Sequence, residues 1–594
     1  MEKKMRNFEE ITLFLGEWGS FQRSIFFWLS VTFVPHGYMS LAMVFLSATP
    51  QHHCTLPPHA DGSVHAAVPY ELVHGKRVLS RCTRYQTANR STESFWNWNE
   101  TEGCLDGWTF STDRYTSTAV TEWSLVCEDA WKAPFASSVL FCGVMVGSLL
   151  SGQVSDRFGR KLVFFISLAL QNVLSLLQAL SSTWELYCIF YFFEGMAQIS
   201  SYMSAFVLGS ELLGKSTRVL FSSLGVCISY ALGYAFLPLF AFFIRDWRML
   251  LVALTLPGFL CLPLWWLIPE SPRWLLSQGR AKEAEAIIQE AARKNGIVAP
   301  EVIFKTSDFS DPQRDNEKDP STSYTFVDLV KTANIRNITV FNMIIWIVTS
   351  MTYYGLSLNT PNLNGDPYLN CFISAATEIV AYVATWLFMR FTPRRFTLVF
   401  LLLLSGAMLL VIKFIPDGTR APRTLPFCPR HHTSVSGLIL AAVFDQRAVI
   451  RSEPDTLTVA LAMLGKTGIT AAYCFIYVYS TELFPTVLRN TGLGAISMAA
   501  RVGTIVSPYI AYIGGTKMHQ LVTVFSIKYG YSAASSIISL LLGEYNKMAP
   551  YFIMGGLSVF VGLLSLLLPE TKDKELPERI NQVKPLGLVG LRSL

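Results

Sequence analysis

The chain contains two halves that repeat the same order of apolar runs and charged loops. Ser-Glu-Leu-Leu at 210–213 and Thr-Glu-Leu-Phe at 481–484 each end an apolar run, and an arginine follows each glutamate seven residues later. Pro-Glu-Ser at 269–271 and Pro-Glu-Thr at 569–571 each end a later apolar run. Duplicated halves of six membrane spans are typical of alternating-access transporters, whose binding site lies between the halves. The repeat therefore predicts an all-α, polytopic membrane carrier.

Apolar runs of membrane-spanning length occur twelve times. A helix needs about 20 mostly apolar residues to cross the hydrocarbon core. Of the 594 residues, 51% are hydrophobic and only 15% are charged, which indicates that most of the chain lies in lipid. The predicted spans are 20–46, 134–151, 162–182, 186–208, 219–243, 247–268, 337–357, 368–389, 396–416, 457–479, 491–513 and 549–568.

These spans form two six-helix halves, 20–268 and 337–568, joined by a polar linker, 269–336, that has a helical pattern at 281–294. Lysines and arginines gather in the loops on one side, which is cytoplasmic by the positive-inside rule. Both termini, including the charged start without a signal-peptide cleavage pattern, are then cytoplasmic. The net charge of +6 reflects this topology, so we expect membrane lipid and no nucleic acid as a partner.

A large loop between the first two spans, 47–133, is predicted to be extracellular. Four of the eleven cysteines lie in it, and disulfides persist in that compartment. Two glycosylation triplets begin at Asn89 and Asn99 in the same loop. We expect two bridges, with the pairing left open, among Cys54, Cys82, Cys104 and Cys127.

The second half is longer than the first in two outer loops, 417–455 and 516–547. Three prolines give the first an irregular character. The second contains a moderately apolar run, which a lysine and two tyrosines interrupt. We expect an external loop or interfacial helix there; the alternative is a thirteenth span, which would place the C-terminus outside.

Residues 152–161, Gly-Gln-Val-Ser-Asp-Arg-Phe-Gly-Arg-Lys, fit a loop pattern between spans two and three. The segment resembles the G-x-x-x-D-R-x-G-R-K motif of the major facilitator superfamily, which implies two six-helix halves. Its glycines are expected to make a close turn, and its aspartate to meet a helix N-terminus or an arginine and lock an inner gate. The alternative is a purely topogenic basic run. We expect the glutamates of the repeat to pair with the arginines seven residues later, and the gate to comprise Asp156, Arg157, Arg160, Glu211, Arg218, Arg394, Glu482 and Arg489.

Four further segments narrow the resemblance. They are Phe-Leu-Gly-Glu-Trp-Gly at 14–19, Ser-Thr-Ala-Val-Thr-Glu-Trp-Ser-Leu-Val-Cys at 117–127, Phe-Phe-Ile-Arg-Asp-Trp-Arg at 242–248 and Ile-Pro-Glu-Ser-Pro-Arg-Trp-Leu at 268–275. They are similar to the organic cation, anion and zwitterion transporter family, most closely to its carnitine and organic-cation subgroup. The resemblance implies a plasma-membrane carrier rather than an enzyme, with a small zwitterion or organic cation as substrate and no resident metal or cofactor.

The eleventh span carries a lone arginine, Arg501, several residues into an apolar helix. An uncompensated charge at that depth costs at least about 2.5 kcal/mol. Cation-selective relatives resemble this segment but have an aspartate there, so we expect Arg501 to hold a substrate carboxylate through a bidentate pair. The alternative is a structural pair with Glu378 in the eighth span.

A quaternary ammonium group needs aromatic faces, because a cation without hydrogen-bond donors is best held by ring quadrupoles. Tyr473 and Tyr477 are four residues apart and share a helix face. Each aromatic side chain has packing as its alternative role. The predicted substrate-binding tyrosines are Tyr202, Tyr230, Tyr354, Tyr473 and Tyr477.

Coupling to sodium is suggested by neutral side-chain oxygens. Gln171 and Gln198 match the subgroup, but this chain has His36 and Ser201 where relatives have asparagines. Two expected oxygen donors are therefore changed, and His36 either makes transport proton-sensitive or only fills space. Glu482 also resembles a residue linked to ion coupling in the subgroup.

Residues 209–216 match the nucleotide-binding pattern G-x-x-x-x-G-K-[ST] through Gly209, Gly214, Lys215 and Ser216. A working phosphate loop follows a strand, whereas this segment follows a predicted membrane helix. We therefore predict a carrier of carnitine or a similar zwitterion and of organic cations. The alternatives are a sodium-independent organic-cation or ergothioneine carrier, a nucleotide-binding membrane protein and an inactive paralogue.

Overall fold

The computed structural model describes residues 11–56, 67–73, 76–87, 96–300, 303–304, 328–414, 454–485, 488–513 and 549–572. Asn89, the insertion 516–547 and all but the last two residues of the insertion 417–455 lie outside these ranges. The predictions made for them stay predictions.

Every predicted span coincides with helix. The first six are α2 (Ser20–Met39) with α3 (Met43–Leu46), α6 (Lys132–Phe158), α7 (Arg160–Ala179), α8 (Trp184–Leu212), α9 (Lys215–Leu220) with η3 (Phe221–Gly225) and α10 (Val226–Phe243), and α11 (Trp247–Leu260) with η4 (Leu262–Trp266). The last six are α16 (Ala333–Leu358), α17 (Pro367–Phe391), α18 (Arg394–Val411) with η6 (Ile412–Phe414), α21 (Pro454–Leu483), α22 (Arg489–Ile513) and α25 (Ala549–Ser565).

Ten helices in the described ranges are long and apolar enough to cross a membrane. The two other predicted spans are α8, which carries more polar side chains, and α25, which has 17 residues. The linker contains α12 (Pro272–Ser277), α13 (Ala281–Lys294) and α15 (Asp328–Lys331). The helical pattern at 281–294 is thus confirmed.

The chain divides into two compact units. One comprises Met1–Ser323 with Thr504–Tyr545, and the other comprises Tyr324–Gly503 with Asn546–Leu594. The boundary falls inside the predicted linker, as expected for two folded halves. Thr504–Tyr545 group with the first unit, although the repeat assigns them to the second half.

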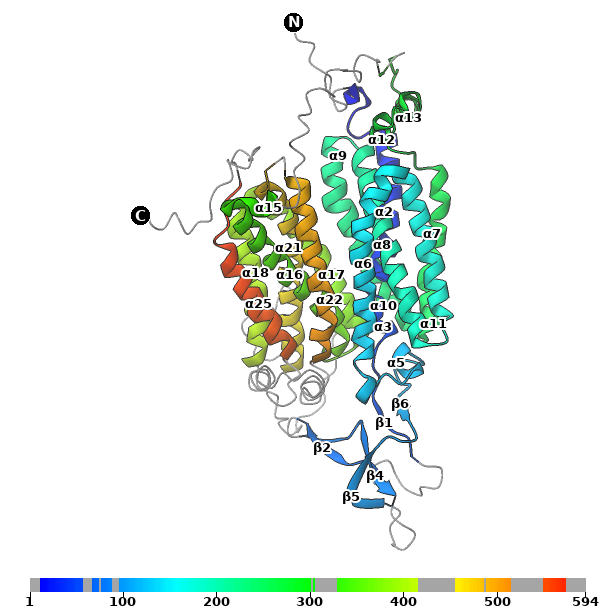
Figure 1. Ribbon diagram of the computed structural model, residues 1–594, viewed down its shortest axis with the longest axis vertical. Helices are drawn as coiled ribbons and strands as arrows, with labels where there is room; N and C mark the ends of the chain where they lie inside the picture. The colour runs from blue at the N-terminus through cyan, green and yellow to red at the C-terminus, as the bar shows by residue number, and fades with distance from the viewer. Residues whose placement is uncertain are drawn as a thin grey trace, which may run out of the picture. The chain divides into compact units, whose positions relative to one another are not determined.

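The same pairs of helices are neighbours in both halves (Figure 1). In the first, α6 and α7 pack on α8, and α11 packs on α7. In the second, α17 and α18 pack on α21, and α25 packs on α18. Because these helices occupy matching positions in the order of spans, the duplication seen in the sequence is a duplication of packing.

One close helix crossing recurs at matching places in the two halves. A Cβ on Gly233 of α10 would lie 2.1 Å from the carbonyl oxygen of Val34 in α2. A Cβ on Gly503 of α22 would likewise lie 2.1 Å from the carbonyl oxygen of Ile347 in α16. Small residues let helix backbones approach in this way, and no side chain can be added without moving the backbone.

We therefore expect Gly503→Ala to lower the melting temperature of the purified protein, through a cost of about 2 kcal/mol from overpacking. Gly494→Ala in the same helix is the matched control, because a Cβ there meets nothing within 4 Å. Alanine also favours helix over glycine by about 1 kcal/mol, so the control should be neutral or slightly stabilising. Equal melting temperatures for the two variants would contradict the crossing.

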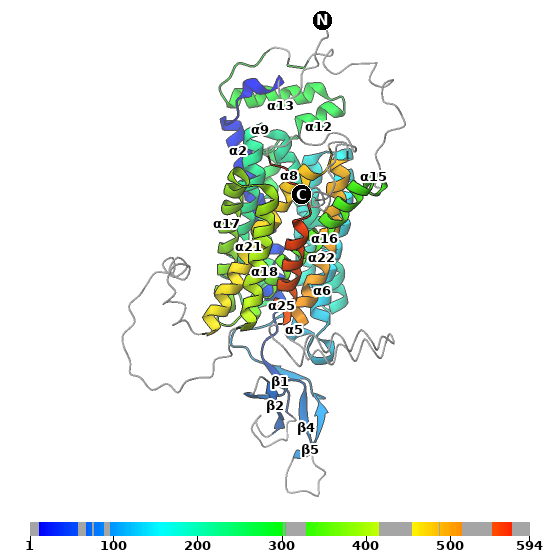
Figure 2. The ribbon, with the colours of Figure 1, turned by 90° about the vertical axis from the view of Figure 1, so that its left-hand side faces the viewer.

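The cysteine-rich loop is built from β-strands, so the all-α description is incomplete. The strands form three antiparallel pairs, each short because the loop is interrupted by turns. Figure 2 shows these strands beyond the end of the first unit's helices that lies opposite α12 and α13. They are β1 (His52–Cys54), β2 (Tyr70–Val73), β3 (Lys76–Leu79), β4 (Thr83–Thr87), β5 (Trp96–Gly103) and β6 (Trp108–Phe110).

Candidate functional site

An arginine at the start of α7 links the loop motif to the end of α8. Arg160 forms ion pairs with Asp156 at 2.6 Å and with Glu211 at 3.3 Å. Its Nη1 also donates to the carbonyl oxygen of Ser155 at 2.9 Å. The predicted meeting of Asp156 with an arginine is therefore present in the structure.

The second half repeats this network. Arg394, at the start of α18, forms an ion pair with Glu482 at 3.4 Å and donates to the carbonyl oxygen of Met389, five residues before it. Thr571 donates a further hydrogen bond to Glu482. Each half thus fastens the start of its third span to the end of its fourth.

The expected pairing of each glutamate with the arginine seven residues later is not what the structure shows. The acids pair with Arg160 and Arg394 instead. Arg218 donates to the carbonyl oxygen of Leu213 at 3.4 Å. The Nε and Nη2 atoms of Arg489 are buried and have no hydrogen-bond partner among the residues that the structure describes. Spacing along one chain could not reveal this, because the true partners come from another helix. Gating by these residues stays a prediction.

Two glutamates that the site prediction omitted cap helices from a distance. Glu270 accepts hydrogen bonds from the backbone N–H groups of Arg160 and Lys161, each at 3.1 Å. Glu570 accepts from those of Arg394 at 2.8 Å and Arg395 at 3.0 Å. These N–H groups have no partner within their own helices, and a carboxylate is favoured at the positive end of the helix dipole. The mirrored Pro-Glu-Ser and Pro-Glu-Thr were the signal for them.

Of the two motif glycines, only Gly159 makes a turn. Its φ is +104°, and a Cβ there would lie 2.6 Å from a carboxylate oxygen of Glu270. Gly152 lies within α6 with nothing inside 4 Å of an added Cβ, so the expectation that it makes a close turn is wrong. A glycine is therefore required at 159 both for its conformation and to admit the capping acid.

Backbone hydrogen bonds outweigh burial at Glu570. Burial alone would raise the pKa of this carboxyl, but N–H donation from Lys572, Arg395, Arg394 and Thr571 holds the pKa below its ordinary value of 4.5. A carboxyl whose pKa is lower in the folded state contributes stability above the unfolded pKa. That stability is lost as pH falls through the folded pKa.

Glu570→Gln should therefore lower stability at neutral pH by about 1 kcal/mol, the size of a helix cap, and have little effect in strong acid. Thermal unfolding followed across pH measures this. Glu128→Gln, at an exposed position, is the control and should leave the curve unchanged. A neutral-pH loss that persists undiminished in acid would argue against capping.

The second unit brings four of its tyrosines together around a tryptophan. The rings of Tyr353 and Tyr473 stack at 5.2 Å and 8°. Tyr477 lies edge-on to Trp346 at 4.4 Å and to Tyr473 at 5.8 Å, and Tyr354 lies edge-on to Tyr353 at 5.0 Å. Three predicted substrate-binding tyrosines therefore belong to one cluster on α16 and α21, and Trp346 is a member that the sequence reasoning missed.

A buried ion pair adjoins this aromatic cluster. Nζ of Lys466 lies 3.1 Å from Glu378, and their side chains are 2% and 0% exposed. Tyr353 donates to the same carboxylate at 3.0 Å, and the lysine also contacts Ser374. The basic partner that the structure gives Glu378 is thus Lys466. The structure therefore does not support the alternative in which Arg501 is the structural partner of Glu378.

Arg501 is buried in α22, with 7% of the residue exposed. The neighbouring residue, Ala500, accepts a hydrogen bond from Ser350 of α16 at 2.7 Å. Ser350 lies one helical turn before Tyr353. The helix that carries the arginine therefore touches the helix that carries the aromatic cluster within about one turn of it.

The first unit holds the other predicted substrate-binding tyrosines and most of the predicted coupling residues. The ring of Tyr202 lies 5.8 Å from that of His36, and the hydroxyl of Tyr230 lies 2.5 Å from that of Ser40. Ser201 contacts Nε2 of His36 at 3.4 Å. Both sodium-candidate glutamines, Gln171 at 1% and Gln198 at 7% exposure, are buried in the same unit.

The segment resembling a phosphate loop is helical on both sides. Gly209 lies inside α8, and Gly214 separates α8 from α9, which begins at Lys215. A phosphate loop instead joins a strand to a helix, with its backbone N–H groups turned to the phosphates. The geometry that nucleotide binding requires is absent from residues 209–216.

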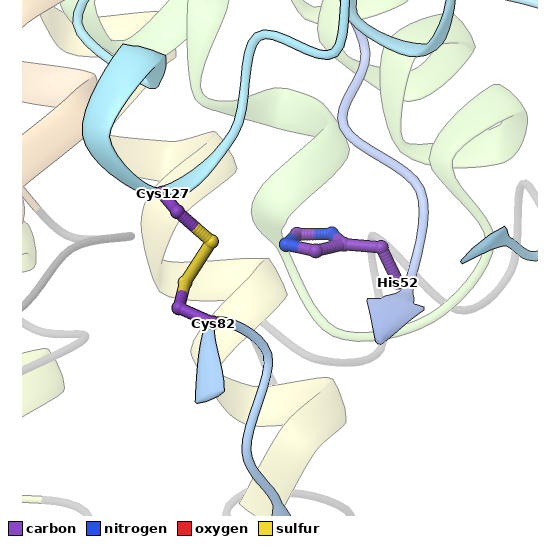
Figure 3. A group of neighbouring side chains, drawn as sticks. All are labelled: His52, Cys82 and Cys127. Carbon is purple, nitrogen blue, oxygen red and sulfur yellow. A yellow bond between two sulfur atoms is a disulfide. The ribbon is translucent and has the colours of Figure 1, made fainter. Parts of the chain in front are cut away.

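Two disulfides hold the strands of the cysteine-rich loop: Cys54–Cys104 and Cys82–Cys127. His52 lies beside the second (Figure 3), with its ring and the two sulfurs within 4.8 Å of one another. Burial lowers the pKa of this imidazole, and the charges of Arg81 and His53 lower it further. A hydrogen bond to the backbone of Pro50 raises the pKa but does not offset these effects. Because the sulfurs are bonded to each other, this group cannot serve as a three-ligand metal site.

Duplicated helical halves, matching charge networks and buried aromatic and charged groups in each half define a membrane transporter of the major facilitator type. A family model described as "Sugar (and other) transporter" matches residues 109–582. The chain is also similar in fold to the xylose transporter XylE of E. coli in a partially occluded inward-open conformation, with a TM-score of 0.55, 15% identity and coverage of 94% of this chain and 100% of that one.

Similar protein sequences identify the family within this class of transporters. The chain is 44% identical to the human organic cation/carnitine transporter 2 over 98% of this chain and 94% of that protein. It is 42% identical to mouse solute carrier family 22 member 21, and 34% identical to the Drosophila melanogaster organic cation transporter protein, over 98% of this chain in both cases and 94% and 95% of those proteins. The chain belongs to the major facilitator superfamily and, within it, to solute carrier family 22, the organic cation, anion and zwitterion transporters.

Proposed function

We propose that this chain is a plasma-membrane carrier of carnitine or a similar zwitterion that joins a carboxylate to a quaternary ammonium group. One observation carries the proposal: a buried arginine and an aromatic cluster lie on touching helices, within about one turn of each other at Ser350 and Ala500. A guanidinium suits a carboxylate, and ring faces suit an ammonium group that has no donor. The names of the human, rat and mouse relatives, organic cation/carnitine transporter 2, support the same substrate.

The ion pair beside the cluster supports this division of roles. Lys466 neutralises Glu378 in a site that lies out of contact with water, so the pair adds no net charge to the aromatic cluster. Arg501 is then the residue we assign to the substrate carboxylate. Tyr353, Tyr354, Tyr473 and Tyr477 are assigned to the ammonium group. The role expected for Tyr202 and Tyr230 stays a prediction.

We expect Arg501→Ala to reduce uptake of labelled carnitine at least about tenfold, because a charge-assisted bond contributes about 1.5–3 kcal/mol. Tetraethylammonium, which has no carboxylate, should be transported as before if it is a substrate. Arg280→Ala, at a half-exposed cytoplasmic position, is the control for loss of an arginine. Surface labelling must show equal amounts of each variant, and unchanged carnitine uptake would remove Arg501 from the site.

A second candidate, a facilitative organic-cation carrier, is favoured by Glu378. Its carboxylate lies among Tyr353, Tyr382 and the ammonium group of Lys466, which itself lies 5.9 Å from the Tyr353 ring. A cation site is therefore already formed there, with the lysine as its occupant. For this candidate, Glu378→Gln should abolish tetraethylammonium uptake while Arg501→Ala leaves it unchanged.

Coupling to sodium is part of the proposal, with Gln171, Gln198, His36 and Ser201 as the residues concerned. Their burial within one unit supports a role apart from solvent. Replacing sodium by N-methyl-D-glucamine should then lower carnitine uptake severalfold. Full uptake without sodium would favour the sodium-independent carrier.

A further inference from the structure

Two helices of the first unit face each other with polar side chains. On α7 these residues are spaced by four and then three positions, and on α8 by four, three and four, so each set forms one stripe along its helix. The two helices pack against each other. The residues are Gln171, Ser175 and Gln178 on α7, and Tyr187, Tyr191, Glu194 and Gln198 on α8.

Burial shows which way these stripes point. All seven side chains are buried. The opposite face of α7 exposes large apolar residues, as a lipid-facing surface does. Those exposed residues are Leu162, Ile166, Leu170, Val173 and Leu177. The α7–α8 seam is therefore polar where ordinary packing of two membrane helices would be apolar.

Glu194 is the one acid in this seam. Only 2% of the residue is exposed, and its Oε2 has no hydrogen-bond partner among the described residues. The hydroxyls of Tyr187 and Tyr191 and both amide atoms of Gln178 also make no well-formed hydrogen bond within the described part of the chain, although Tyr187 lies near Gln178 and Ser47. Buried polar groups are nearly always paired, so a cluster of open ones indicates a site for water or an ion.

No permanent positive charge reaches this depth from the helices packed around it. Lysine and arginine are absent from all of α8, from 162–179 of α7, from 133–155 of α6 and from 24–39 of α2. The short elements η3 and α12 add only Arg273. Arg248 of α11, which packs on α7, reaches only the Gln178 end of the seam, where it donates to the carbonyl oxygens of Ala179 and Ser181. The remaining titratable groups on these helices at that depth are Tyr187, Cys188 and Tyr191 on α8, Cys142 on α6, and His36 and Tyr38 on α2.

We propose that Glu194 is a binding site for a small inorganic cation, a proton or a sodium ion, which the carrier takes up together with its substrate. An ionised carboxylate in an apolar interior is costly unless a positive charge accompanies it. Amide and hydroxyl oxygens around it are the donors that a hard cation prefers. The stripe continues along α8 through Gln198 to Ser201, which contacts His36, so the site is continuous with the predicted coupling residues.

This inference rests on the proposed transport function only for its second experiment. The first needs no substrate. The melting temperature of the full-length purified protein is measured at acidic and alkaline pH, with sodium chloride or N-methyl-D-glucamine chloride. A bound cation stabilises the folded state, so the wild type should melt about 2 °C or more higher in acid, for a proton, or with sodium, for a sodium ion.

Glu194→Gln keeps the shape and removes the charge, so this variant should lose that response and melt at least as high as the cation-bound wild type. Glu185→Gln is the matched control, because Glu185 is exposed at the start of the same helix. It should respond as the wild type does. An unchanged response in Glu194→Gln, to both pH and sodium, would overturn the proposal and leave the seam as a water-filled structural feature.

The second experiment measures uptake of labelled carnitine under the same conditions. Glu194→Gln should retain uptake but lose its stimulation by whichever cation stabilised the wild type. Uptake that keeps its full dependence on pH and sodium in this variant would refute the coupling role while the transport function stands. A melting response at Glu194 without carnitine uptake by the wild type would refute the proposed substrate while the cation site stands.

Discussion

Every charge that this chain places inside its helical halves needs an opposite charge close by, and this requirement shapes the structure. Lys466 and Glu378 satisfy each other at 3.1 Å in a dry interior. Arg160 and Arg394 pair with acids from neighbouring helices at partly exposed positions, where water still screens the charges. Arg501 and Glu194 are the two buried charges to which we assign mobile partners, a substrate carboxylate and an inorganic cation.

The duplicated halves use one arrangement of charged residues where the third span begins and the fourth span ends. In each, an arginine that opens the third span reaches an acid at the end of the fourth, and a glutamate beyond the sixth caps the third. Only the first half adds an acid one turn before the arginine, Asp156. The networks for which we expect a gating role therefore differ between the halves, because Arg160 pairs with two acids and Arg394 pairs with one among the described residues.

Patterns that depend on one helix were predictable from the sequence, and patterns that depend on two were not. The spans, the linker helix and the stripe of Tyr473 and Tyr477 follow from hydropathy and helical spacing. The partners of Glu211 and Glu482 do not, because the arginines that pair with them lie 51 and 88 residues away along the chain, whereas the competing arginines lie close in sequence and only packing excludes them. Glu194 was overlooked because its apolar run reads as an ordinary span; a single acid in such a run, with tyrosines three and seven residues before it, was the available signal.

The remote caps have a mechanical consequence. Glu270 and Glu570 each tie the chain just beyond the sixth span of a half to the first turn of that half's third span. If one of these helices tilted against the other, the first N–H groups of the third helix would lose these hydrogen bonds, and their own helix offers them no replacement. The third and sixth helices of a half are therefore joined at these ends, and any rearrangement during a transport cycle must move them together as one rigid body.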